Sequence, residues 1–533
     1  MTEDFLSLLY PSAESLARHE SGKSRPNISE DVCTELGMDN IFLLKNNSLS
    51  DFFTVDAEVI RYRQDTLRDV RNNPELAETL EKALPILFDI RELRELDRDT
   101  GTSSGDSYLY SITEIELYIS AVDVLYRGLS PLRDRLESEA FRHMAEVIFR
   151  LAESDYFKEL NEKLEQLSRR VHEVRSITVG VNLDAQLRPC DAGILSVNSE
   201  TFKSGKVLDK ILRMSFRNDA FTCIAPLAPF GKGQSDNRKE ALMSAFLSAI
   251  EDVFRSSVRQ WRTIVGEYVL DNTDFLLRIL PEIEFVTLAT KLSATLRERG
   301  YPLTVPVLRP MEEKAFCAKG LFNPSVAVKI EDTVVENDFT FDDGGRIYVL
   351  SGPNRGGKSV ITCAVGLCQA MAQLGLEVPA ARAEISPVDA IFTHFPTGAD
   401  DTIDKGRLGE ECARLREIFD AITENSMVLL DESLSSTGAY EASYIAAELL
   451  AGFAVARVRG IFSTHLHELA AKMDEINERA ARDGGVKVDT LVAGMEEGRR
   501  SFRIVRQKPD GKSHARDIAN KYGLAYEDLI SKK

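Results

Sequence analysis

Residues 352 to 359 read GPNRGGKS and fill the GxxxxGK[S/T] pattern of a phosphate-binding loop. Such a loop wraps backbone N–H groups around a polyphosphate, so glycine is needed wherever a Cβ would hold the chain away from the oxygens. Lys358 then reaches the β and γ phosphates, and the hydroxyl of Ser359 is placed for Mg²⁺. A chance glycine-rich turn is the alternative, which the flanking sequence disfavours. The predicted nucleotide-binding residues are Gly352, Pro353, Asn354, Arg355, Gly356, Gly357, Lys358, Ser359 and Val360.

An acidic pair follows a second apolar run farther along the chain. Residues 427 to 430 are apolar and end in Asp431 and Glu432, which is the arrangement of a Walker B element. An aspartate at a strand end can hold the Mg²⁺ shell, and the next glutamate can orient or deprotonate the attacking water. We therefore predict that Ser359 and Asp431 bind the metal ion and that Glu432 and Lys358 are catalytic.

A histidine follows a third strand-like run. Residues 460 to 463 lead directly into Thr464 and His465. A histidine at a strand end, beside two nucleotide-binding motifs, can sense a γ-phosphate, although a lone histidine is more often structural. We include His465 among the predicted catalytic residues. His467 has no comparable argument, and we expect it to begin or cap a helix with Glu468.

The chemistry requires a strand, a loop and a helix in that order. Residues 347 to 350 form a short β-branched and aromatic run that ends at the loop. The segment from Val360 to about Leu374 has the character of a helix, whose positive N-terminal end would point at the bound anion. The flanks of the loop therefore predict an α/β nucleotide-binding domain in the C-terminal part of the chain.

Composition sets broad limits. The chain has 533 residues, 43% of them hydrophobic and 28% charged, which suggests a globular protein of about three domains. No apolar run approaches the ~18 residues needed to cross a bilayer, and the acidic N-terminus is unlike a secretory signal, so we expect a cytoplasmic protein without a membrane partner. Seven scattered cysteines without a CxxC pair predict free thiols rather than a zinc site. The net charge of −19 gives nucleic-acid binding no support from composition.

The first half of the chain has helical patterns around a β-rich segment. Apolar residues recur at helical spacing from about residue 56 to residue 174, where the last helix could be a core helix or part of a coiled coil. Residues 177 to 184 and 193 to 198 are typical of strands, and a further helix is expected around residues 247 to 268. Its Arg255, Arg259 and Arg262 share one side, which could face a phosphate backbone or be an ordinary solvated face. Three prolines in residues 301 to 310 predict an extended linker.

These residues resemble a known family. The stretches GPNRGGKS, LLDESLSSTGAYEASYIAAELL and IFSTHLHEL, with MAQLGLEVPAARAEISPVDAIFT at 371 to 393, closely resemble the ATPase domain of the DNA mismatch-repair MutS family, a branch of the ABC-type ATPases. Residues 513 to 530 resemble its closing helical segment. Residues 55 to 76, and the order of helix, β-rich insert and helix, resemble its core, lever and clamp regions more loosely.

The resemblance implies an ABC-type P-loop ATPase domain over residues 311–533. Before it would come a mainly α-helical core and lever region over residues 46–310, with a small β-rich, clamp-like insert at 177–237, and an N-terminal segment over residues 1–45. It implies ATP and Mg²⁺ as cofactors and a homodimer formed through the ATPase domains. DNA is the implied partner, a further repair-protein partner is unidentified, and the protein would associate with the nucleoid when it binds DNA.

Several residues depart from the family pattern. Leu408, in the run from Gly406 to Glu411, stands where the family has a serine that reaches the γ-phosphate held by the partner, so that contact would come from Gly409 N–H or Arg407, or be absent. Val334 stands where the family has an aromatic residue that stacks on adenine, and it is the predicted base contact. After Glu432, the family's glycine-rich loop becomes Ser433 to Thr437, whose hydroxyls could meet the partner subunit.

The resemblance leaves two functions open. Residues 1–45 are too few for the family's mismatch-reading domain, and no nuclease extension follows the ATPase domain, so neither mismatch reading through a wedge nor DNA cutting is predicted. The first reading is an ATP-dependent DNA-binding protein that acts on mismatched, branched or other non-B structures in repair or recombination. The alternative is a nucleotide-switched scaffold of the same fold that acts on a protein partner, which the acidic charge favours.

Overall fold

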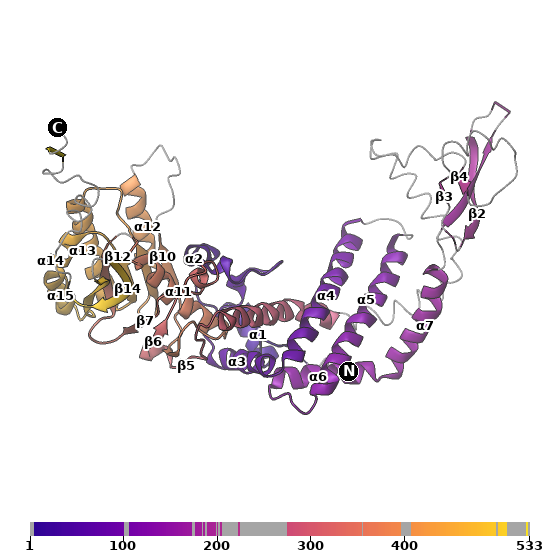
Figure 1. The fold of residues 1–533 in the computed structure, drawn as a ribbon, viewed down its shortest axis with the longest axis horizontal. Helices are drawn as coiled ribbons and strands as arrows, with labels where there is room; N and C mark the ends of the chain where they lie inside the picture. The colour runs from indigo at the N-terminus through magenta and orange to yellow at the C-terminus, as the bar shows by residue number, and fades with distance from the viewer. Residues whose placement is uncertain are drawn as a thin grey trace. The chain divides into compact units, whose positions relative to one another are not determined.

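The chain divides into two compact units. Unit 1 consists of Met1–Pro74, Leu136–Phe141 and Pro281–Lys533, and unit 2 consists of Glu75–Arg135 and Arg142–Leu280. This computed structural model (Figure 1) describes residues 5–100, 106–172, 176–183, 185–186, 189–198, 200, 203–204, 222–223, 274–353, 355–395, 407–496, 499–508 and 529–530. The predicted helix around residues 247 to 268, with Arg255, Arg259 and Arg262, lies outside these described residues, as do residue 354, residues 224–237 of the predicted insert and most of the predicted closing segment.

A six-stranded sheet forms the centre of unit 1 (Figure 1). Its strand order is β10-β11-β12-β8-β13-β14, and every neighbouring pair is parallel except β13 and β14, which form an antiparallel hairpin. The three predicted strands are confirmed as β8, β11 and β12. The strands are β8 (Ile347–Ser351), β10 (Ile391–His394), β11 (Met427–Asp431), β12 (Arg459–Ser463), β13 (Val488–Glu496) and β14 (Arg499–Arg506).

Helices cover both faces of this sheet. On one face, α11 (Lys358–Leu374) packs against β11, and a Cβ on Gly366 would come within 2.7 Å of the Leu429 side chain. On the other face, α12 (Arg407–Ala421), α13 (Ala439–Val455) and α15 (Met473–Arg482) enclose an apolar core with Val428, Leu430 and Phe462. Because both faces are buried, the strands have continuous rather than alternating apolar sequences.

A second sheet incorporates the predicted linker. The order is β5 (Val307–Leu308), β9 (Arg382–Ile385), β6 (Phe316–Leu321) and β7 (Asn337–Phe341). Residues 301 to 310 are extended, as predicted, but they are not a free linker. Thr304 exchanges backbone hydrogen bonds with Val378, and β5 pairs in parallel with β9. The preceding helix ends at residue 298, before the first proline, and Gly300 turns the chain with φ +84°. The segment stays joined to unit 1 because it pairs with residues that lie more than seventy positions later in the chain.

The N-terminal segment is part of unit 1. The Asn27 N–H donates to the Asp389 carbonyl at 2.7 Å and the Ile391 N–H donates to the Asn27 carbonyl at 3.1 Å, so the segment continues the sheet beyond the β10 edge. The helix α2 (Glu30–Leu36) packs against α11 and β10, and a Cβ on Gly366 would lie 2.5 Å from Leu36 Cδ2. These contacts join residues before position 45 to the body that carries the phosphate-binding loop.

The C-terminal end of α11 and the residues that follow it form hydrogen bonds with α3 (Ala57–Asn72) and with a second helix, of which residues 281–298 belong to unit 1. Arg63 on α3 is fully buried and donates to the Leu374 carbonyl at 3.4 Å. Glu377 accepts hydrogen bonds from Arg71 on α3 and, at 2.7 Å, from Arg297. Arg297 lies on the helix that the structure describes over residues 274–298. The α3 helix and the 274–298 helix are thus attached to the residues that follow α11.

Unit 2 contains the remaining long helices and a β-hairpin. The α4 and α5 helices approach closely, since a Cβ on Gly128 would clash with Thr79, and α5 packs on α7 through Tyr118 and Phe157 at 6.2 Å between ring centroids. Two predicted strands are confirmed as the antiparallel pair β1 and β2. The elements are α4 (Pro74–Thr100), α5 (Asp106–Leu129), α6 (Glu139–Ala152), α7 (Asp155–His172), β1 (Ser176–Leu183), β2 (Pro189–Asn198), β3 (Lys203–Ser204) and β4 (Thr222–Cys223).

Short elements complete the described chain. They are α1 (Ala13–Glu20), α10 (Pro324–Ala327), α14 (His467–Ala471), η1 (Met38–Asn40), η2 (Leu49–Asp51), η3 (Ser130–Leu132) and η5 (Met311–Glu313). The predicted helix start at His467 is confirmed by α14. Within the described residues, no helix is both long and apolar enough to cross a membrane.

Shortening Leu36 should destabilise the unit that carries the loop. We expect Leu36→Ala to lower the free energy of unfolding by about 2–4 kcal/mol, because it removes a buried side chain that packs on α11. Leu43→Ala is the matched control in the same segment, since Leu43 is 70% exposed, and should change stability by less than about 0.5 kcal/mol. Urea unfolding followed by circular dichroism measures both. Equal midpoints for the two variants would contradict the packing described above.

Candidate nucleotide site

The phosphate-binding loop runs from the end of β8 to the start of α11. Gly352 has φ +142° and Gly357 has φ +93°, values that residues other than glycine rarely adopt. The hairpin β13–β14 also packs against this loop. A Cβ on Gly352 would come within 2.7 Å of Ala493, and one on Gly357 would lie 3.5 Å from the ring of Phe502. Both positions therefore need glycine for their backbone conformation, and Gly352 needs it also because the hairpin leaves no room for a side chain.

The side chain of Lys358 lies against the backbone of the loop. Its ammonium group donates to the carbonyl oxygens of Gly352 at 3.2 Å and Pro353 at 3.4 Å. Burial lowers the pKa of Lys358, while the carboxylates of Glu432 and Asp431 act in the opposite direction. The cation thus lies on the loop, where a bound polyphosphate would meet it.

Asp431 provides an unsatisfied oxygen at the end of β11, which β12 separates from β8. It is the last residue of β11, pairs in register with Ser463 of β12, and is 5% exposed. Its Oδ1 atom and the Ser463 hydroxyl are buried without a hydrogen-bond partner among the described residues. An unpaired buried carboxylate oxygen is costly, and coordination of Mg²⁺ would satisfy it.

The other predicted metal-binding residue, Ser359, lies at the start of α11. Ser359 is the second residue of that helix and is exposed, as is Val360. Among the described residues, no group of three or more His, Cys, Asp and Glu side chains could hold a metal ion. A Mg²⁺ ion at this site would therefore depend on Ser359, Asp431 and the oxygens of a bound phosphate, which is the donor set that Mg²⁺ prefers.

Glu432 and His465 meet beside Lys358. His465 Nε2 lies 2.7 Å from Glu432 Oε1 and 3.2 Å from Lys358 Nζ. Both side chains are partly exposed. Glu432 has φ +48°, and its N–H donates to the Ser463 carbonyl at 2.9 Å. The side chains of Lys358, Glu432 and His465, which are far apart in the sequence, thus lie next to one another. Their chemical roles stay predictions.

Val334 does not present a free surface to a base. It is buried, and its N–H donates to the Tyr301 hydroxyl at 2.9 Å. Tyr301 in turn stacks on Phe322 with 4.7 Å between ring centroids. The predicted base contact is therefore covered within its own domain.

Phe502 is a residue that the sequence analysis missed. It is 44% exposed, has φ +57° and contacts Gly357. Asn337 binds the strand directly after this residue, because its amide donates to the Phe502 carbonyl at 3.2 Å and accepts from the Ile504 N–H at 2.7 Å. The one signal in the sequence is that Phe502 is the only aromatic residue in the strand RRSFRIVR.

The residues predicted to contact a partner subunit have different surroundings. Leu408 packs against the apolar core beneath α12, whereas a Cβ on Gly409 would meet open space. The Ser433 hydroxyl binds His394, and the Thr437 hydroxyl donates to Glu441 of the same chain. Leu408 and these two hydroxyls are therefore engaged within their own subunit, whereas Gly409 and Ser435 are exposed.

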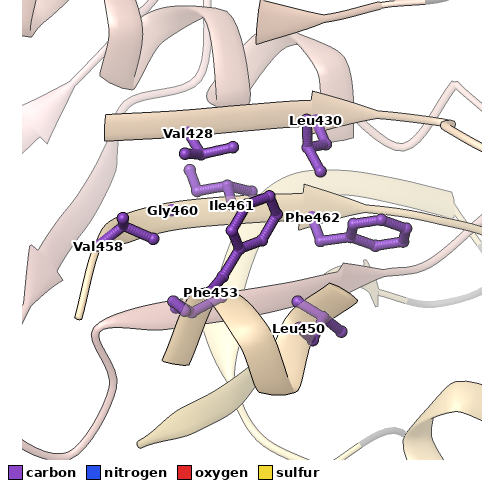
Figure 2. Close-up of a pocket in the computed structure, with 9 residues that line it drawn as sticks. Val428, Leu430, Leu450, Phe453, Val458, Gly460, Ile461 and Phe462 are labelled. Carbon is purple, nitrogen blue, oxygen red and sulfur yellow. The ribbon is translucent and has the colours of Figure 1, made fainter. Parts of the chain in front are cut away.

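A small apolar cavity lies away from this site (Figure 2). Figure 2 shows its walls on strands and on α13, with Val428, Leu430, Leu450 and Phe453 directed toward the space. Its lining includes no charged side chain. It lies within the hydrophobic core under α13, and it is not a site for a nucleotide.

The sheet, the loop and the acidic strand end define a P-loop nucleotide-binding domain. Two family models match the chain, the MutS2 N-terminal domain over residues 55–299 and MutS domain V, the ATPase domain of that family, over residues 348–522. The chain is a MutS-related protein.

Three relatives illustrate the similarity. Endonuclease MutS2 of Thermus thermophilus is 28% identical over 275 residues, which is 49% of this chain and 36% of that protein. DNA mismatch repair protein MutS of Desulforapulum autotrophicum is 24% identical over 455 residues, 80% of this chain and 49% of that protein. DNA mismatch repair protein MutS 2 of Halobacterium salinarum is 38% identical over 154 residues, 28% of this chain and 18% of that protein. The chain spans less than half the length of each of them.

Proposed function

We propose that this protein binds and hydrolyses ATP with Mg²⁺ and couples the reaction to binding of DNA in repair or recombination. The observation that supports this most strongly is the convergence of Lys358, Asp431, Glu432 and His465 at one edge of the sheet. The MutS family matches and the names of the relatives favour DNA over other partners. We propose a cytoplasmic homodimer that joins through the ATPase domains.

Each residue has a distinct part in the proposed reaction. The loop N–H groups and Lys358 bind the phosphates, and Ser359 and Asp431 would hold a Mg²⁺ ion that neutralises phosphate charge. The Glu432 carboxylate accepts the proton of the attacking water. His465 holds Glu432 at 2.7 Å before phosphate binds and turns to the γ-phosphate afterwards. The expectation that this chain does not cut DNA stays a prediction, since one relative is named an endonuclease.

Coupling to DNA would pass through the C-terminal end of α11. This helix begins at Lys358 and ends beside the Arg63 and Glu377 contacts, which reach α3 and the 274–298 helix. A displacement of α11 on phosphate binding would move these attached helices with it. The net charge of −19 favours the scaffold alternative, in which the same movement acts on a protein partner.

DNA-dependent turnover distinguishes the two functions. We expect the ATPase rate of the full chain to change several-fold with a four-way junction or mismatched duplex at low salt, and less with homoduplex or single strands. Lys358→Ala is the control and should abolish turnover with every DNA. If the protein hydrolyses ATP at a rate that no DNA changes, DNA coupling is rejected and the scaffold function remains. If the protein does not hydrolyse ATP at all, the proposed ATPase activity is rejected.

We propose Phe502 as the aromatic contact of the base, because it is exposed next to Gly357 whereas Val334 is covered. Phe502→Ala should weaken Mg-ATP binding about tenfold, since stacking of a base on an aromatic ring contributes roughly 1–3 kcal/mol. Binding of Mg-tripolyphosphate, which lacks a base, should stay unchanged. Calorimetry measures both ligands.

Val505→Ala is the matched control, since Val505 lies on the same strand and is also exposed. It should bind both ligands as the wild type does. Equal loss of ATP and tripolyphosphate binding by Phe502→Ala would show that this residue supports the loop rather than the base.

A further inference from the structure

The turn after Asp431 has an unusual backbone. Glu432 has φ +48° and Leu434 has φ +65°, so two residues with side chains adopt the left-handed region within three positions. This region is unfavourable for residues other than glycine and persists only where the surroundings enforce it. The turn carries the carboxylate that we propose as the base. Whatever holds this backbone therefore also places that carboxylate.

Three contacts enforce the turn. The Glu432 N–H donates to the Ser463 carbonyl at 2.9 Å, and the Leu434 side chain is completely buried in the core beneath α12 and α13. Between them, the Ser433 hydroxyl lies 2.8 Å from His394 Nδ1 and 3.3 Å from the His394 carbonyl. Of these three contacts, only the one between Ser433 and His394 involves a polar side chain of another strand.

His394 is suited to this task by its position and its surroundings. It ends β10, beside β11 in the parallel sheet, and is 6% exposed. The charged groups around it are Arg414 of α12 and Glu35 of α2, which pair with each other at 2.6 Å. Burial first, and then Arg414, lower the pKa of His394. The ring is thus a neutral hydrogen-bonding group.

We propose that His394 is a positioning residue that acts through Ser433 to hold Glu432 in place for hydrolysis. The inference rests on the proposed ATPase function, and it assigns no contact with ATP to either residue. The Ser433 hydroxyl lies close to both Nδ1 and the carbonyl oxygen of His394, so rotation of the Ser433 segment would break both contacts together. Loss of either partner would free the strained turn to relax and move the Glu432 carboxylate away from its place.

Kinetics of four variants test the proposal. We expect His394→Ala and Ser433→Ala to lower kcat roughly 10- to 100-fold, because small displacements of a catalytic group have effects of this size, while KM for ATP stays within about twofold. His394→Asn should recover most of kcat, since its amide can occupy the position of Nδ1. His19→Ala is the matched control, a buried histidine of α1 whose Nε2 lies 2.6 Å from the Asp51 carbonyl. It should leave kcat unchanged.

Hydrogen exchange gives a second readout that does not require turnover. Amides of residues 432 to 434 should exchange faster in His394→Ala and Ser433→Ala, and at the wild-type rate in His394→Asn and His19→Ala. Unchanged exchange in the first two variants, or a kcat that His19→Ala lowers equally, would overturn the positioning role. If the wild type does not hydrolyse ATP, the proposed function fails, and the exchange data still decide whether His394 holds the turn.

Discussion

The parallel hydrogen-bonding of β11, β12 and β8 is the constraint on which the site depends. Because these strands are parallel and adjacent, their carboxyl ends lie at one edge, where Asp431 pairs with Ser463 and β8 passes into the phosphate-binding loop. Burial on both faces by α11 and α13 holds this register, since a slip of one residue would reverse the side chains of each strand. The distances among Lys358, Glu432 and His465 follow from that pairing rather than from any local sequence.

The same edge leaves polar groups without partners inside a well-packed domain. Asp431 Oδ1 and the Ser463 hydroxyl are buried and unpaired, and the Lys358 ammonium rests on loop carbonyls. Elsewhere, buried polar groups such as Asp69 accept several hydrogen bonds. Buried polar atoms without a hydrogen-bond partner among the described residues also occur at Tyr118, Glu284 and Arg459. What distinguishes this edge is its position beside Lys358, where a cation and a polyphosphate would supply the missing partners.

Local patterns predicted the parts of this site that neighbouring residues determine. The apolar runs before Gly352, Asp431 and Thr464 became strands, and the segment after the loop became α11, because those signals lie within a few residues. Long-range pairing could not be predicted in this way. The bonds of Asn337 to the Phe502 strand, the pairing of residues 301 to 310 with β9, and the packing of Leu36 on α11 all join distant segments. Val334 was predicted from a family position, but it is buried and its N–H donates to Tyr301, a distant partner that no nearby residue signals.

In the proposed ATPase, Glu432 is the base that hydrolysis requires, and the phosphate-binding loop binds ATP without it. Single-turnover hydrolysis and ATP binding by Glu432→Gln, measured beside the wild type, test this role most directly. We expect hydrolysis by Glu432→Gln to be at least about 100-fold slower, which is the scale of general-base catalysis, with ATP affinity within about threefold of the wild type. Turnover at the wild-type rate in Glu432→Gln would contradict this role.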